Sequence, residues 1–185
     1  MANSNNKRSY FRVNDKVALK VHAIEDGSIN DLYEKRKREI GVANRFLHDR
    51  ETKRPSLLSI EKRFPEVASY IEYLEDKIQT LANQSSEQIQ LPQTPTHEVS
   101  LSATGLCYNA SQPVALDTPV EITMRLFPSR MMVYVVGQVT RCTPVAGGQS
   151  FDVAVKYTHI HEEDEDLLFK HVNYVQMDSL KVVVN

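Results

Sequence analysis

Apolar residues alternate with polar ones in two separate parts of the chain, and the stretch between these parts follows a helical period. In residues 10–24 the alternation favours a β-strand, and the Asp-Gly pair at 26–27 is a turn signal that would end it. The strand pattern returns after residue 96 and predicts further antiparallel strands separated by turns. These strands are expected at residues 97–108, 119–127, 131–142 and 151–159.

The intervening stretch is rich in Glu, Lys, Arg, Leu and Ala and has almost no strand signal. A first helix is predicted at residues 29–47, followed by a connector, HDRETKRP, that ends at Pro55. Arg36 interrupts the apolar stripe of this helix. The stripe itself consists of Ile29, Tyr33, Ile40, Ala43 and Leu47.

A second helical stretch carries apolar residues at strict intervals of three and four. This heptad pattern is typical of a helix that packs on partner helices as a coiled coil. Pro65 predicts that the helix either begins there or kinks there, and the first helix of the same chain is one alternative for the partner. The predicted oligomerisation residues are Leu57, Ile60, Phe64, Val67, Ile71, Leu74, Ile78 and Leu81.

The C-terminal region is predicted to be helical and to follow the last strand. Five acidic residues at 162–166 suit a helix N-terminus, and Leu168, Val172 and Val175 form one apolar face. A polar, proline-containing linker at 83–96 separates the helical stretch from the later strands. The order of elements therefore predicts an α+β fold. Residues 1–27 and 93–185 form the β domain with its C-terminal helix, and residues 28–92 form an inserted helical oligomerisation segment.

Composition limits the classes of function. The chain has 185 residues, 41% of them hydrophobic and 25% charged, as in soluble globular proteins. Its net charge of -2 gives no bulk attraction to nucleic acid or to an anionic membrane, so any anion site must be local. We find no secretion signal and no apolar run of the ~20 residues that a membrane helix needs, which predicts a cytoplasmic protein. Cys107 and Cys142 are expected to be buried, free thiols.

Two short motifs carry the candidate chemistry. In RSYFR, Arg8 and Arg12 stand four residues apart just before the first strand, and a guanidinium group suits both phosphates and base edges. In SLSATG, Ser100, Ser102 and Gly105 place two hydroxyls and a flexible backbone position at a strand start. Each motif alone also has an ordinary explanation, as an exposed basic lead-in or as a Ser/Gly turn.

Taken together with the order of elements, RSYFR, SLSATG, GQVTRC and FDVAVKY resemble the PilZ domain family, the bacterial receptors for cyclic di-GMP. The resemblance covers residues 8–27 and 97–180. It implies a small antiparallel six-stranded β-barrel with a C-terminal helix. The heptad-bearing insertion resembles an atypical branch of the family, in which long helices oligomerise the barrels, including into tetramers.

The resemblance also implies a ligand site. Arg8 and Arg12 would hold the phosphates and guanine edges of cyclic di-GMP, with Ser102 and Gly105 completing the site. Ser100 departs from the family, which has Asp or Asn at this position, because a hydroxyl is shorter and offers one oxygen. We expect this departure to weaken binding by roughly one to two decades. Glu98 lies on the same side of the strand and is a partial substitute.

Two functions are therefore predicted. The first is a cyclic di-GMP-responsive binding or adaptor protein of bacterial signalling, a dimer or tetramer through its helices, in which the ligand folds the N-terminal arm against the barrel. The alternative is a degenerate oligomeric scaffold that does not bind cyclic di-GMP and acts through contacts with other proteins. A downstream protein partner is expected in both, without an indication of its identity. An RNA-binding barrel is less favoured, because no basic and aromatic strand face is found.

The remaining polar clusters are interpreted as structural. The sequence has no nucleophile–base pattern, phosphate-cradling glycine-rich loop or metal-ligand spacing, so enzyme activity, a cofactor and a metal are not predicted. His159 and His161, which precede acidic residues, are interpreted as surface side chains rather than metal ligands. The run EKRKRE at 34–39 is interpreted as a solvated helix face rather than a nucleic-acid site.

Overall fold

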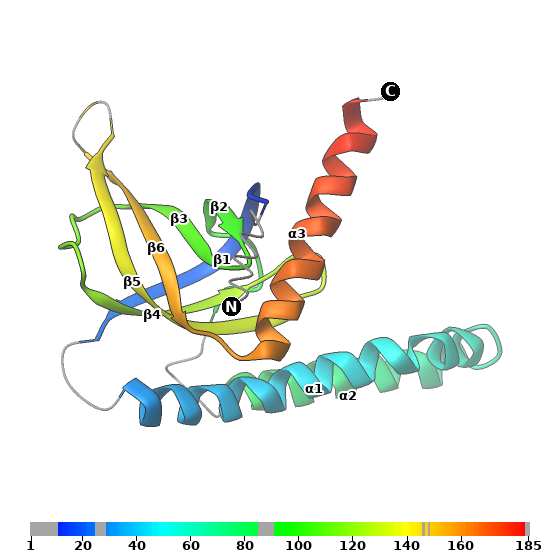
Figure 1. The fold of residues 1–185 in the computed structure, drawn as a ribbon. Coiled ribbons are helices and arrows are strands. Elements are labelled where there is room, and N and C mark those ends of the chain that lie inside the picture. The colour runs from blue at the N-terminus through cyan, green and yellow to red at the C-terminus, as the bar shows by residue number, and fades with distance from the viewer. Residues whose placement is uncertain (1–10, 25–28, 85–90, 146, 148, 184–185) are drawn as a thin grey trace, which may run out of the picture.

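The computed structural model describes residues 11–24, 29–84, 91–145, 147 and 149–183. Figure 1 shows the strands gathered into one barrel, with two long helices side by side beneath it and the C-terminal helix beside it. In chain order the elements are β1 (Val13–Ala23), α1 (Ile29–Glu61), α2 (Pro65–Gln84), β2 (His97–Ser102), β3 (Gly105–Ala110), β4 (Pro119–Arg125), β5 (Met132–Pro144), β6 (Phe151–His159) and α3 (Glu162–Val183).

The strands form a closed antiparallel barrel in the order β1-β2-β3-β6-β5-β4. The long strand β1 closes it, because residues 13–17 pair with β2 and residues 18–23 pair with β4. The predicted α+β fold, a six-stranded antiparallel barrel with a C-terminal helix, is confirmed.

One strand prediction is wrong. Residues 97–108 form two strands, β2 and β3, which are joined by a turn at residues 103–104. The chain reverses there because the Ser102 side chain bonds to the backbone of the turn. SLSATG therefore ends one strand and begins the next.

The barrel interior is packed with the inward side chains of every strand. Leu101, Leu106, Ile122 and Val135 have no exposed surface, which is worth about 1.5–3 kcal/mol for each such side chain. From α3, Leu168 and Val172 join this core, as predicted. The apolar face of α3 therefore covers the barrel and fixes the position of the helix.

A second, smaller core lies outside the barrel, where α1 covers the outer face of β5. Tyr33 and Ile40 of α1 are buried there against Met132, Tyr134 and Val136 of β5. Burial and the nearby Asp164 carboxylate raise the pKa of Tyr33 to about 12. The predicted apolar stripe of the first helix is confirmed at Tyr33 and Ile40.

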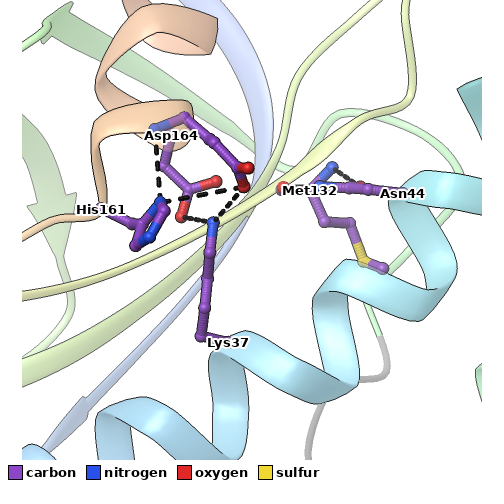
Figure 2. A network of polar contacts seen from close by, with 6 residues as sticks. Lys37, Asn44, Met132, His161 and Asp164 are labelled. Carbon is purple, nitrogen blue, oxygen red and sulfur yellow. Dashed lines mark hydrogen bonds and ion pairs between the residues drawn. The ribbon is translucent and has the colours of Figure 1, made fainter.

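Polar contacts hold α1 in place on both sides of this small core (Figure 2). The Asn44 side chain bonds both backbone groups of Met132, since its Nδ2 donates to the carbonyl oxygen at 2.6 Å and its Oδ1 accepts from the amide at 2.8 Å. Lys37 Nζ lies 2.8 Å from Asp164 Oδ2 and 3.7 Å from Glu163 Oε2, at the start of α3. The helix is thus bonded to both β5 and α3.

The run at residues 34–39 is only in part the solvated face that we expected, since Glu34, Lys35 and Arg38 are exposed. Arg36 is buried, and its guanidinium lies 3.4 Å from Glu39 Oε2 and 3.7 Å from Glu121 Oε2. Lys37 points at the acidic start of α3. These cations face the barrel because β4 and α3 supply carboxylates that compensate their charge.

The helices also differ from the prediction. Helix α1 continues past residue 47 and through Pro55 to Glu61, so the predicted connector is helical. A proline in a helix interior costs about 3 kcal/mol, but the residues beyond it pack along α2. Leu57 and Leu58 line a cavity together with Glu72 of α2. Helix α2 begins at Pro65, one of the two predicted outcomes.

The eight heptad residues are divided between two helices, in agreement with the predicted alternative in which the second helix begins at Pro65 and packs on the first. Leu57 and Ile60 lie on α1, Phe64 lies in the turn, and the others lie on α2. The turn forms because residues 62–64 leave the helix just before Pro65. The insertion is thus a helical hairpin.

Two further features are absent from the described residues. There, no helix combines the length and the apolar character needed to cross a membrane. In the same part of the chain, no group of three or more His, Cys, Asp or Glu side chains is arranged to hold a metal ion.

Candidate ligand-binding face

The outer face of β1, β2, β3 and β6 carries the predicted motif residues. The antiparallel register places Asn14 of β1 opposite Ser100 of β2, and Ser100 opposite Cys107 of β3. The same row continues from Cys107 to Ala154 of β6 and from Ala154 to Arg141 of β5. A band of small and polar side chains therefore crosses five strands.

Arg12 lies at the edge of this face, immediately before β1, and its side chain is exposed. Its Nη2 atom is 3.6 Å from the place that a Cβ atom on Gly105 would take. Burial raises the pKa of Tyr157, and the positive charge of Arg12 opposes that shift. The structure thus brings Arg12 and Gly105 together, whereas Arg8 lies outside the described residues.

Gly105 has a structural reason to be glycine. A Cβ atom there would lie 2.7 Å from the carbonyl oxygen of Val155, closer than side-chain carbons approach a backbone oxygen. The absence of a side chain lets β3 pair closely with β6 at this point. Gly105 is buried, and the Arg12 guanidinium lies beside it.

Ser102 is used inside the turn rather than at the surface. It is 1% exposed, and its hydroxyl donates to the carbonyl oxygen of Gly105 at 3.1 Å. The same hydroxyl accepts from the Thr104 amide at 3.3 Å. The hydroxyl proton is thus donated to the backbone, and the side chain stabilises the hairpin turn that precedes Gly105.

Ser100 is half-buried in the middle of the row, between Asn14 and Cys107. Glu98, the predicted partial substitute, lies two residues away on the same face. Its Oε1 is 3.1 Å from Lys16 Nζ, directly across from it on β1. The Glu98 carboxylate thus lies toward Lys16.

Sequence reasoning missed Arg141 as a residue of this face. A β-bulge between Val139 and Arg141 shifts the register, which places Arg141 opposite Ala154. Its Nη2 donates to the Cys107 sulfur at 3.7 Å, reaching across β6 where Ala154 is small. The motif GQVTRC contains this arginine, but the sequence pattern cannot locate a bulge. Cys107 and Cys142 are free and half-buried, rather than fully buried as predicted.

Charge is unevenly distributed along the face. Near the turn between β2 and β3, Arg12 and Lys156 flank Gly105, and Arg141 lies opposite Ala154 on β5. At the other end, Asp152 accepts a hydrogen bond from Asn109 at 3.3 Å. The end near the turn is therefore basic, although the whole chain has a net charge of -2.

In the part of the chain that the structure describes, this face is the outer surface of the barrel sheet. A hollow of about 690 Å³ opens at the other end of β2 and β3, where His97, Glu98, Tyr108 and Asn109 are among its lining residues. Arg12, Ser100 and Gly105 do not line it. A ligand on the basic end would lie against the strands and bind to side chains that project from them.

Comparison with protein families decides where this fold belongs. The profile of the PilZ domain matches residues 78–174, slightly more than half of the chain. The chain belongs to the PilZ domain family. The matched region runs from α2 through β2–β6 into α3, whereas β1 and RSYFR precede it because the helical hairpin is inserted between β1 and β2.

One solved structure supports the fold, and a second is a weaker match. A pathogenic protein of Xanthomonas campestris, described as a new tetrameric PilZ domain self-assembled through an unusual helical bundle, has a TM-score of 0.55 and 13% identity; the match covers 94% of this chain and 90% of that one. The Bacillus subtilis inhibitor of motility, MotI/DgrA, has a TM-score of 0.40 and 14% identity. That match covers 44% of this chain and spans 42% of the length of MotI/DgrA. No curated protein matches the sequence.

Proposed function

We propose that this PilZ protein is a cyclic di-GMP-responsive binding or adaptor protein that self-associates through its helical hairpin. One observation supports the ligand most strongly. Two cationic side chains, Arg12 and Lys156, lie beside Gly105, and a third, Arg141, lies opposite Ala154, on a face that α1 leaves uncovered. Such a site attracts an anion locally, in a chain without a bulk positive charge.

The proposed ligand matches this chemistry. Cyclic di-GMP has two phosphates and two guanines, and a guanidinium can bind a phosphate with two parallel hydrogen bonds or stack on a base. Arg12 and Arg141 offer two such groups, and Lys156 adds a compact charge. Ala154 is small and half-buried, so a flat base can approach β6 between Lys156 and Arg141. Arg8 completes RSYFR and is proposed as a fourth cationic contact.

Calorimetric titration of the full chain with cyclic di-GMP tests the proposal. Arg12→Ala and Arg141→Ala should each weaken binding by about 10- to 100-fold, because each removes charge-assisted hydrogen bonds. Arg8→Ala should do the same. Lys16→Ala is the matched control, since Lys16 lies on the same face of β1 but pairs with Glu98. Its affinity should stay within about twofold of the wild type.

The proposal fails if the wild-type chain gives no heat with millimolar cyclic di-GMP. It also fails if cyclic di-AMP binds equally well, since adenine presents a different hydrogen-bonding edge. Equal loss in Lys16→Ala and Arg12→Ala would indicate a diffuse charge effect rather than a site.

Self-association rests on a separate observation, the exposed apolar face of α2. On this helix Ala68 is buried and Ile71 is half-buried, whereas Val67, Leu74 and Ile78 are 50%, 41% and 49% exposed. Helix α1 lies alongside α2, so the hairpin covers only part of the heptad pattern (Figure 1). An exposed stripe with this spacing is the surface that helices bury against other helices. The tetramer of the Xanthomonas protein, built by a helical bundle, is consistent with this proposal.

Sedimentation velocity tests self-association. The wild type should sediment as a dimer or tetramer of the 21.1 kDa chain, and the double variant Leu74→Lys/Ile78→Lys as a monomer. Leu116→Lys is the control, because Leu116 is 61% exposed in the β3–β4 connection. A monomeric wild type would contradict the proposal. An oligomer that gives no heat with cyclic di-GMP would instead favour the alternative, a degenerate scaffold that acts through protein contacts.

A further inference from the structure

Recognition of guanine needs more hydrogen-bond acceptors than the Ser100 side chain offers. The Watson–Crick edge of guanine presents two adjacent donors, N1–H and N2–H, and a serine hydroxyl has a single oxygen on a short side chain. Ser102 is bonded within its turn, and Glu98 is paired with Lys16. A second acceptor near Ser100 must come from another strand.

Asn14 lies where this second acceptor is needed. It is the residue of β1 directly opposite Ser100, and side chains opposite one another in an antiparallel pair have Cβ atoms about 4.5–5.5 Å apart. Its neighbour Val13 is buried in the barrel core, so the alternation of the strand turns Asn14 outward, where it is exposed. The next outward pair, Lys16 and Glu98, makes contact at 3.1 Å across the same two strands.

The chemistry of Asn14 fits the missing contact. Its carboxamide oxygen accepts hydrogen bonds at two lone pairs, on a side chain longer than that of serine. Within the described residues, no hydrogen bond occupies this carboxamide. Arg12 lies two residues earlier, on the same side of the chain, so one segment presents a guanidinium and a carboxamide next to each other.

We propose that Asn14 determines guanine specificity in this protein, because it supplies from β1 the acceptor that position 100 lacks on β2. The proposal rests on the proposed binding of cyclic di-GMP. The Asn14 Oδ1 atom accepts from the guanine N1–H and N2–H edge, and the Ser100 hydroxyl supports it. The acceptor thus comes from the strand opposite position 100.

Titration of the full chain with cyclic di-GMP and cyclic di-IMP, which lacks the N2 amino group, tests the role of Asn14. Asn14→Ala should weaken cyclic di-GMP binding by about tenfold and reduce the preference for cyclic di-GMP over cyclic di-IMP. Asn109→Ala is the matched control, since Asn109 is exposed on the same sheet but bonds to Asp152. It should leave both the affinity and the preference unchanged.

The exchange variant Asn14→Ser/Ser100→Asn separates a carboxamide contact from a structural effect. It returns the carboxamide to the other strand and should bind cyclic di-GMP within about threefold of the wild type, whereas Asn14→Ser alone should be as weak as Asn14→Ala. An exchange variant as weak as Asn14→Ser overturns the inference. The inference is also overturned if the wild type binds cyclic di-GMP and Asn14→Ala leaves both its affinity and its preference over cyclic di-IMP unchanged. A wild type that binds neither dinucleotide overturns the proposed function, and this inference with it.

Discussion

The outward-facing residues in the two halves of strand β5 lie in different surroundings. In the first half, Met132, Tyr134 and Val136 point out of the barrel and are buried under α1. In the second half, Gln138 and Arg141 point outward and are exposed. The same barrel wall is therefore a packing surface at one end and a polar surface at the other.

Strand β1 likewise has a covered part and an exposed part. Its outward residue Ala18 is completely buried in the small core, whereas Asn14 and Lys16, earlier in the strand, are solvated. Substitutions on the two faces should therefore have different consequences. Changes on the covered face should lower stability, and changes on the open face should alter ligand affinity with little effect on folding.

Tyr134→Ala should have the largest effect on stability. Tyr134 has no exposed surface, and its hydroxyl donates to Glu121 Oε2 at 3.0 Å. Removal of a large buried aromatic side chain should lower the free energy of unfolding by about 3–5 kcal/mol, as measured by urea denaturation. Lys156→Ala on the open face is the control and should change it by less than about 0.5 kcal/mol. Equal losses in the two variants would abolish the distinction between the faces.

Asn44→Ala should have the next largest effect. This substitution leaves the amide and the carbonyl of Met132 without the side-chain partner that joins α1 to β5. We expect a loss of about 1–3 kcal/mol in the free energy of unfolding. Hydrogen exchange should locate the change, with faster exchange at Met132 and unaltered exchange at Leu106 on the far side of the barrel. Unchanged exchange at Met132 would show that the Asn44 bonds do not hold α1 in place.

Asp164 should give a smaller, pH-dependent effect at the edge of the covered face. Burial raises its pKa above the ordinary value of 3.8, although the Lys37 ammonium opposes this shift. A raised pKa means that the folded state holds the proton more tightly, so this contribution to stability is complete at low pH and is lost as the pH rises through the folded pKa. Asp164→Asn should therefore reduce the decline in stability as the pH rises above about 4. A steeper decline in the variant would contradict this sign.

Lys16→Ala should have the smallest effect on stability. The ion pair with Glu98 spans 3.1 Å, but its side chains are 69% and 80% exposed, so solvent screens most of the attraction. We expect the free energy of unfolding to change by less than about 0.5 kcal/mol, with no dependence on salt beyond this amount. A loss above about 1 kcal/mol would show that the open face also stabilises the fold.

Much of the fold could be predicted from local sequence patterns. The period of two located β1, β4, β5 and β6, and the apolar face at Leu168 and Val172 located α3, because each element needs one buried side. The motifs, together with the order of elements, also indicated the PilZ family. The roles of Arg8, Arg12, Ser100, Ser102 and Gly105 in binding stay predictions. For Ser102 and Gly105 the folded chain adds a packing reason, which the motif does not reveal.

The amino-acid sequence was sufficient to locate the alternating residues, the acidic helix start and the motif residues. Three features depended on the folded chain: which half of β5 is covered, the extension of α1 through Pro55, and the place of Asn14 and Arg141 on the motif face. The difference arises because the first group follows from neighbours along the chain. The second depends on strand register, a bulge and helix docking, which bring together residues as distant as Asn14 and Ser100.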